Sequence, residues 1–105
     1  MDSCIFCKIL NGDIPSELIY ENDDVVAFND INPKAKTHIL IIPRKHIDMI
    51  KNLEDSDSEL VGKMVTAARD IAKDKELDGY QLQFNVDKAG GQEVFHIHLH
   101  LTSNS

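Results

Sequence analysis

Residues 93–101 read Glu93-Val94-Phe95-His96-Ile97-His98-Leu99-His100-Leu101, in which apolar side chains alternate with histidines. Successive side chains of a β-strand point to opposite faces, so the segment is predicted to be a strand with two unlike faces. The odd positions would pack on the core, and the even positions would hold His96, His98 and His100 in one row, about 6.6 Å apart. Such a row is costly on a half-buried sheet without a purpose, which favours a functional site. Tolerated surface histidines or adventitious metal ligands are the alternative.

The rest of the chain predicts a sheet and one long helix. β-branched and aromatic runs between turn residues indicate strands at 18–21, 25–29, 37–42 and 80–86, and a short helical turn is expected at 4–10. Because the long helix is segregated from consecutive strands, we expect an α+β fold with a five-stranded, mainly antiparallel sheet.

The long helix is expected to begin at a capping box formed by Ser56 and Glu59 and to end at a left-handed Gly79. Apolar residues recur between these ends at spacings of three and four, which predicts a stripe that faces the core. The stripe consists of Leu60, Val61, Met64, Val65, Ala68, Ile71 and Ala72.

Length and charge limit the classes of function. The 105 residues fit a single domain, 1–105, small enough that a second copy would help to bury apolar surface. The net charge of −7 opposes binding to nucleic acid or to anionic membranes, although a single nucleotide can still bind through local donors. Neither a membrane-spanning run nor a secretory signal is visible, so we expect a cytoplasmic protein, small enough to enter a nucleus.

The histidine segment suits chemistry at phosphorus. Gly90 and Gly91 precede it, and glycine lets backbone N–H groups approach an anion closely. Imidazole attacks phosphorus well when its other nitrogen is held by an acceptor, and it leaves readily afterwards. One histidine could therefore attack a phosphate while a neighbour donates hydrogen bonds to it.

Four segments resemble the conserved blocks of the histidine triad (HIT) family, in order and over nearly the whole chain. Residues 91–100 are similar to its signature, and Cys4-Ile5-Phe6-Cys7-Lys8-Ile9 resembles the opening of its nucleotide-binding, phosphoramidase branch. Residues 27–33 and 37–46 resemble its second and third blocks. The resemblance implies a HIT-like fold and a homodimer.

The resemblance also implies a reaction. The enzyme would hydrolyse purine nucleoside phosphoramidates, derivatives of AMP or GMP, at the α-phosphorus, with His98 forming a nucleotidyl-histidine that water cleaves and His100 binding the phosphate. One alternative is cleavage of dinucleoside polyphosphates or adenylated adducts. Others are a nucleotide-sensing scaffold with vestigial hydrolysis and a zinc-dependent interaction module.

The nucleotide contacts that the resemblance implies cover the whole ligand. Asp30 would bind the ribose, although Asp at this kind of position is more often a turn residue. Glu93 stands where the best-known eukaryotic phosphoramidases have serine, so this chain departs from their pattern near the leaving group. The base would be enclosed by Phe6, Ile9, Phe28 and Ile31, with Asn29 beside them, and the phosphate end would be lined by Asn85, Gly91, Gln92, Glu93 and Val94. Ordinary core packing is the alternative for the apolar residues.

Cys4 and Cys7 form a Cys-x-x-Cys pair at the start of the chain. A redox role has little support because no strand precedes the pair. The resemblance implies instead a structural zinc site completed by His46 and His96, with no open coordination position. Two unliganded thiols are the alternative. His38, in an apolar strand, is expected to be a hydrogen-bonded core residue with a supporting role.

Overall fold

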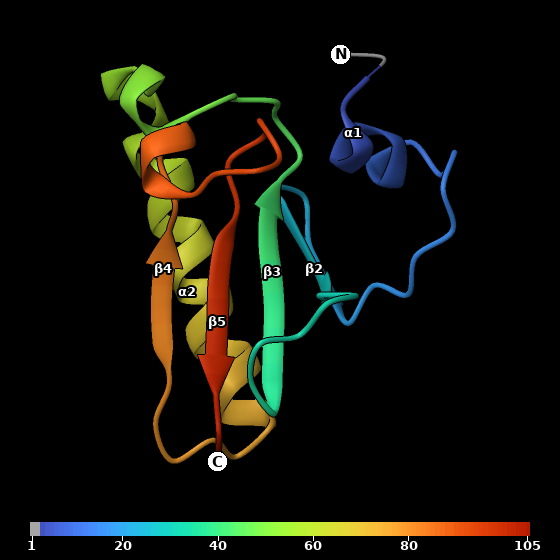
Figure 1. The fold of residues 1–105 in the computed structure, drawn as a ribbon, viewed down its shortest axis with the longest axis vertical. Coiled ribbons are helices and arrows are strands. Elements are labelled where there is room, and N and C mark those ends of the chain that lie inside the picture. Colours follow the sequence, from blue (N-terminus) through green and yellow to red (C-terminus); the bar gives the residue numbers. More distant parts are fainter. Residues whose placement is uncertain (1–2) are drawn as a thin grey trace.

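The computed structural model describes residues 3–105 and contains a five-stranded sheet (Figure 1). The strand order is β1-β2-β3-β5-β4, and all neighbouring strands are antiparallel. The strands are β1 (Tyr20–Glu21), β2 (Val25–Asn29), β3 (Thr37–Pro43), β4 (Gln81–Phe84) and β5 (Leu99–Ser103). The expected α+β architecture is confirmed.

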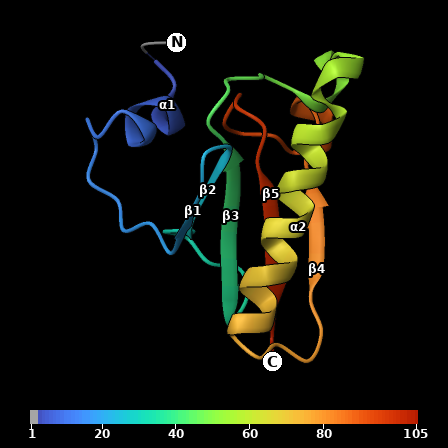
Figure 2. The same cartoon turned by 180° about the vertical axis from the view of Figure 1, so that it is seen from behind.

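Two helices cover opposite faces of the sheet. Helix α2 (Ser58–Asp74) lies along one face, as Figure 2 shows, and packs Met64, Ala68 and Ile71 against the odd-numbered side chains of β3 and β5. Helix α1 (Ile5–Leu10) lies on the other face, where Phe6 packs against even-numbered side chains of β2 and β3. The second face is therefore only partly covered, over β2 and β3. Short 3₁₀ turns occur at Ile50–Asn52, Asp55–Asp57 and Lys88–Gly90.

The predicted caps of the long helix are wrong at both ends. The capping box joins Glu54 and Asp57 in the 3₁₀ turn that leads into α2, and the Asp57 carboxylate also accepts a hydrogen bond from Lys45 Nζ at 2.7 Å. At the other end Glu76, not Gly79, takes the left-handed conformation, with φ of 56°. The N–H groups of Glu76 and Leu77 bond back to the last turn of the helix, so the helix closes before Gly79 is reached.

The histidine segment forms a shorter strand than expected. β5 begins at Leu99, so His96 and His98 precede it in irregular backbone. Pairing between β3 and β5 stops at Ile41 and Leu99, and beyond it the Pro43 carbonyl accepts a hydrogen bond from the His96 ring instead. The alternation of faces nevertheless holds, because Ile97, Leu99 and Leu101 are all buried against α2.

Within residues 3–105, no helix combines the length and apolar character that crossing a lipid bilayer would require.

Candidate functional site

His98 is a buried histidine with one nitrogen committed to a hydrogen bond. Its Nδ1 lies 2.8 Å from the carbonyl oxygen of His96, which can only accept, so Nδ1 carries the proton. The other nitrogen, Nε2, is left with a free lone pair. Burial lowers the pKa of His98, which keeps the ring neutral near pH 7. A neutral imidazole held in one tautomer is what a nucleophile towards phosphorus requires.

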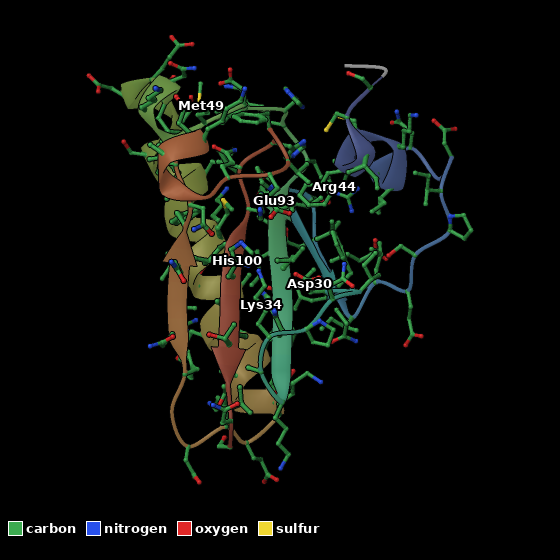
Figure 3. The ribbon with its side chains drawn as sticks, viewed as in Figure 1. Asp30, Lys34, Arg44, Met49, Glu93 and His100 are labelled. Carbon is green, nitrogen blue, oxygen red and sulfur yellow. The ribbon has the colours of Figure 1, made fainter. Side chains whose placement is uncertain are left out.

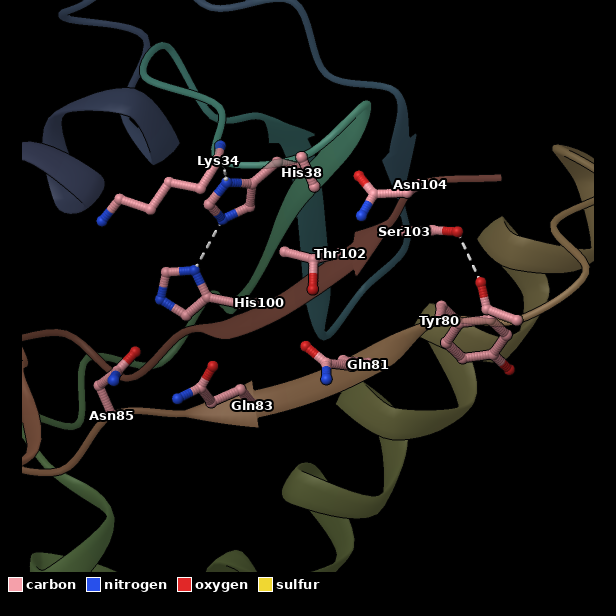
Figure 4. A pocket seen from close by; sticks show the side chains of 12 residues that line it. Lys34, His38, Tyr80, Gln81, Gln83, Asn85, His100, Thr102, Ser103 and Asn104 are labelled. Carbon is pink, nitrogen blue, oxygen red and sulfur yellow. Dashed lines mark hydrogen bonds between the residues drawn. The ribbon is translucent and has the colours of Figure 1, made fainter.

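His100 is the end of a hydrogen-bonded chain that starts at the main chain. The N–H of Lys34 donates to His38 Nδ1 at 3.1 Å, so the proton of His38 lies on Nε2. That Nε2 donates to His100 Nδ1 at 2.9 Å, as Figure 4 shows, and the proton of a neutral His100 must then lie on its own Nε2. Burial lowers the pKa of His100 to about 4. His100 therefore presents a neutral N–H donor beside His98, with 4.9 Å between the ring centroids.

Asp30 stands next to this chain. Its Oδ2 lies 3.4 Å from His38 Nε2, and its Oδ1 accepts a hydrogen bond from the N–H of Asn32 at 2.8 Å. The hydrogen bond from Asn32 is typical of a turn residue, which was the alternative to ribose binding for Asp30. The carboxylate remains partly exposed at the end of β2, next to the exposed Asn29.

A buried apolar cluster around Phe6 borders the histidines on the α1 side. The Phe6 ring meets Phe28 edge to face at 5.6 Å and His98 at 5.1 Å, and Ile9 packs against the same cluster. Ile31 does not join them, because 90% of it is exposed. The structure thus brings together three of the four residues expected around the base, and leaves the fourth open to solvent.

The loop that contains Gly90 and Gly91, called the glycine loop, is held by the Asn85 side chain. The side chain Nδ2 of Asn85 donates to the carbonyl of Gly90 at 2.8 Å, and Gly91 adopts a φ of 85°. The left-handed backbone favours glycine there, whereas a Cβ would meet the same Nδ2 at 3.4 Å, an ordinary contact.

Gln92 is buried, and its side chain is fully engaged within the protein. Its Oε1 accepts from the N–H of Asp87, and its Nε2 donates to the carbonyls of Asp48 and Val94. Its side chain therefore braces the loop, and any contact with a ligand would come from its main chain. Val94 packs on the apolar cluster around Phe6.

Glu93 is exposed and lines a separate hollow with Cys4, Ile5 and Asp48. In Figure 3 it lies above His100, whereas Lys34 lies below that residue. The Glu93 carboxylate thus belongs to the hollow beside α1.

A separate cluster of side chains contains the four residues that the resemblance implies for zinc, Cys4, Cys7, His46 and His96. The Nδ1 atoms of His46 and His96 are 3.1 Å apart, and His96 Nδ1 lies 3.5 Å from Cys4 Sγ and 3.6 Å from Cys7 Sγ. His96 Nε2 bonds to the Pro43 carbonyl at 2.9 Å, so its Nδ1 points into the cluster without a proton. Burial lowers the pKa of His96 to about 4. Four donor atoms within 4.8 Å of one another could hold a metal ion.

Reasoning from the sequence missed Lys34, whose backbone N–H binds His38 Nδ1. His38 is hydrogen-bonded, as expected, but its partner is His100, 62 residues further along the chain. That contact depends on the register of β3 with β5, in which Leu40 faces His100. Register follows from which faces of the two strands are buried and from the connections between them, so the contact between His38 and His100 is not visible in either segment alone.

Comparisons with known proteins agree with this geometry. The family model described as "Scavenger mRNA decapping enzyme C-term binding" matches residues 3–105. Protein HitA of Neisseria gonorrhoeae is 45% identical over 102 residues, which cover 96% of this chain and 95% of that protein. The purine nucleoside phosphoramidase of Escherichia coli strain K12 is 44% identical over 102 residues, covering 95% and 86% of the two chains. The crystal structure of a HIT family hydrolase from Legionella pneumophila Philadelphia 1 matches with a TM-score of 0.94 at 48% identity, covering 98% and 94%. The chain therefore belongs to the histidine triad family, within the group that this decapping-enzyme model describes.

Proposed function

We propose that this protein hydrolyses purine nucleoside phosphoramidates at the α-phosphorus, with His98 as the nucleophile. The observation that carries the proposal is the hydrogen bond from His98 Nδ1 to the His96 carbonyl, which leaves Nε2 free to attack. A relative 44% identical over most of this chain is named a purine nucleoside phosphoramidase, which supports the same reaction.

The reaction would proceed in two displacements. His98 Nε2 forms a bond to phosphorus while the phosphorus–nitrogen bond breaks, and the departing amine takes a proton from solvent. The Nε2–H of His100 donates a hydrogen bond to a phosphate oxygen and stabilises the charge that develops there. Water then attacks phosphorus, releasing the nucleoside monophosphate and restoring His98.

The apolar cluster around Phe6 would bind the purine. Phe6 and Phe28 are almost fully buried beside His98, so a base would lie against the edge of this cluster, and the exposed Ile31 would become buried when it does. Asp30, whose carboxylate lies 3.4 Å from His38 Nε2, would accept hydrogen bonds from ribose hydroxyls. The main chain of the glycine loop would complete the phosphate end.

We propose further that the cluster of Cys4, Cys7, His46 and His96 holds one zinc ion. Tetrahedral zinc with bonds of about 2.0 Å to nitrogen and 2.3 Å to sulfur has nitrogen–nitrogen edges of about 3.3 Å and nitrogen–sulfur edges of about 3.5 Å. The contacts among Cys4, Cys7, His46 and His96, from 3.1 to 3.6 Å, fit these edges. Such an ion would fix α1 to the histidine segment and take no part in the displacements.

A homodimer in the cytoplasm completes the proposal. β4 is an edge strand, and its exposed Leu82 and the adjacent Tyr80 offer apolar surface to a second copy. Light scattering on the purified protein tests the dimer, and fractionation of cells tests the location.

Turnover of two substrates tests the reaction. Adenosine 5′-phosphoramidate should be cleaved much faster than a diadenosine polyphosphate, and brief exposure to substrate should leave a nucleotidyl adduct that peptide mass spectrometry locates at His98. A strong preference for the dinucleotide would favour the alternative hydrolase. Cellular function that survives His98→Ala with turnover lost would favour a scaffold.

A further inference from the structure

A hollow distinct from the one at Glu93 adjoins His100, on the side away from the apolar cluster around Phe6. It has a volume of about 650 Å³ and runs over the open face of β4 and β5, as Figure 4 shows. Gln81 and Thr102 face each other across these strands, as do Gln83 and His100. The hollow is therefore a polar groove with His100 at its border, and it is referred to below as the β4–β5 groove.

The groove and the apolar cluster around Phe6 lie on the same face of the sheet, on opposite sides of His100. Leu40, which belongs to that cluster, is the register partner of His100 on one side. Gln83 is its partner on the other side. A substrate whose base lies against the apolar cluster and whose phosphorus lies at His98 and His100 would extend its remaining substituent towards the groove.

The charge of the groove is unlike that of the chain. The chain has 18 acidic residues, and within residues 3–105 none of the side chains that line the groove is acidic, although the Asp30 carboxylate lies 3.4 Å from the lining residue His38. Lys34 contributes the cationic side chain and is exposed, while Gln81 and Gln83 add exposed amide N–H donors. Among the residues that the structure describes, Lys34 is the cationic side chain that lines the groove, so it can pair with an anion, while His100 offers a neutral N–H donor.

We propose that the β4–β5 groove is the leaving-group subsite and that it favours amine leaving groups carrying an anion. A carboxylate of this kind would come from an amino acid joined to the α-phosphorus through its nitrogen. In the first displacement the phosphorus–nitrogen bond breaks, the electron pair leaves with nitrogen, and a solvent proton converts the product to a free amino acid. Further phosphates of a nucleotide leaving group would present the same charge. This inference rests on the proposed function.

Three matched substrates test the groove. We would measure kcat/KM for adenosine 5′-phosphoramidate, for its glycine-linked derivative and for the glycinamide-linked twin, in which the carboxylate is neutralised. The glycine derivative should be preferred over the glycinamide derivative by about fivefold, the size of effect that one exposed ion pair can have. Equal rates for these two substrates would overturn the proposal.

Variants assign the preference to Lys34. Lys34→Gln should bring the ratio of the two rates close to one, and Lys34→Glu should invert it, while the backbone N–H that binds His38 is kept. Lys36→Gln is the matched control, since Lys36 is exposed in the same loop but does not line the groove. A ratio that survives Lys34→Gln, or that falls equally in Lys36→Gln, would contradict the assignment.

Two further measurements separate the possible failures. Unsubstituted adenosine phosphoramidate reports the basic reaction, so its His98-dependent turnover without any glycine preference would refute the groove alone. If a diadenosine polyphosphate is preferred over the glycine derivative and the preference depends on Lys34, the charged subsite is supported and the anion is phosphate. If that preference is independent of Lys34, the subsite is refuted.

Discussion

Two clusters of ionisable side chains flank His98, and they use similar residues in opposite ways. In the first, Cys4, Cys7, His46 and His96 direct their donor atoms to one shared centre. In the second, Asp30, His38 and His100 are equally close together, yet the two rings already bond to each other. Proximity of ligand atoms is therefore a poor guide to a metal site unless each nitrogen is followed to its partner.

The difference arises from the main-chain groups that hydrogen-bond to the histidine rings. The Pro43 carbonyl holds the proton of His96 on Nε2, which turns its Nδ1 lone pair towards the sulfur atoms. The N–H of Lys34 does the reverse for His38, since it occupies Nδ1 and directs a proton towards His100. A main-chain carbonyl that binds one ring nitrogen leaves the other nitrogen unprotonated and able to bind a metal. A main-chain N–H that binds one ring nitrogen leaves the proton on the other, which can then donate to a neighbouring ring.

The largest effect is expected from the residue between the two clusters. His98→Ala removes the nucleophile and should lower kcat for adenosine phosphoramidate by at least about 10⁴-fold. Metal content should stay that of the unchanged protein, because neither cluster loses a member, and the melting temperature should fall only by what the small cavity at this buried site costs. Retained turnover above about one tenth would show that another residue attacks phosphorus.

Breaking the first cluster should affect folding and substrate binding more than chemistry. The double variant Cys4→Ser, Cys7→Ser is expected to lose bound zinc and to lower the melting temperature by about 10 °C. Since Phe6 lies between the two cysteines in sequence and contacts His98, KM should rise about tenfold while kcat changes by less than about threefold.

The second cluster supplies the control for this experiment. His100→Gln should keep about one equivalent of zinc per chain by elemental analysis while losing activity. Loss of zinc in that variant, or full zinc content in the double cysteine variant, would mean that the metal binds elsewhere.

The second cluster should also make stability depend on pH. The pKa of His100 is about 4 in the folded protein and near 6.5 in an unfolded chain, so the unfolded chain binds a proton more readily. Its contribution is fully present above about pH 6.5 and is lost as the pH falls towards 4. The shift corresponds to at most about 3 kcal/mol, and we expect about 2 kcal/mol because the ring is only partly buried. Urea unfolding of the protein and of His100→Gln at pH 7 and pH 4.5 measures how much unfolding free energy each loses on acidification. Equal losses in the two proteins would refute the prediction.

Much of the fold follows from local patterns in the sequence. Alternation placed Ile97, Leu99 and Leu101 on the core face, and the helical spacing predicted the burial of Met64 and Ile71. The ends of elements were harder to predict. They depend on where a strand loses its partner, as β5 does before Leu99, and on which residue a closing turn selects for the left-handed position.

The candidate site was predictable as a set of residues but not as a network. The resemblance supplied Cys4, Cys7, His46 and His96, which the structure brings together. The hydrogen bonds that assign tautomers run between main chain and side chain across distant strands, as from His38 to His100. The direction of Glu93 away from the β4–β5 groove and the engagement of the Gln92 amide likewise depend on a loop whose shape no repeat or period specifies.

The smallest expected effect tests the direction of the relay itself. His38→Ala removes the donor to His100 Nδ1, so His100 can place its proton on either nitrogen and presents the phosphate with a donor only part of the time. We expect kcat/KM to fall about tenfold, with zinc content unchanged. His38→Gln can carry an amide N–H close to the position of the original Nε2 and should recover most of the loss. Nitrogen NMR of the histidine rings should show His100 with its proton on Nε2 in the unchanged protein and in His38→Gln, and a mixture in His38→Ala. The same tautomer in all three proteins would mean that His38 only fills space beside His100.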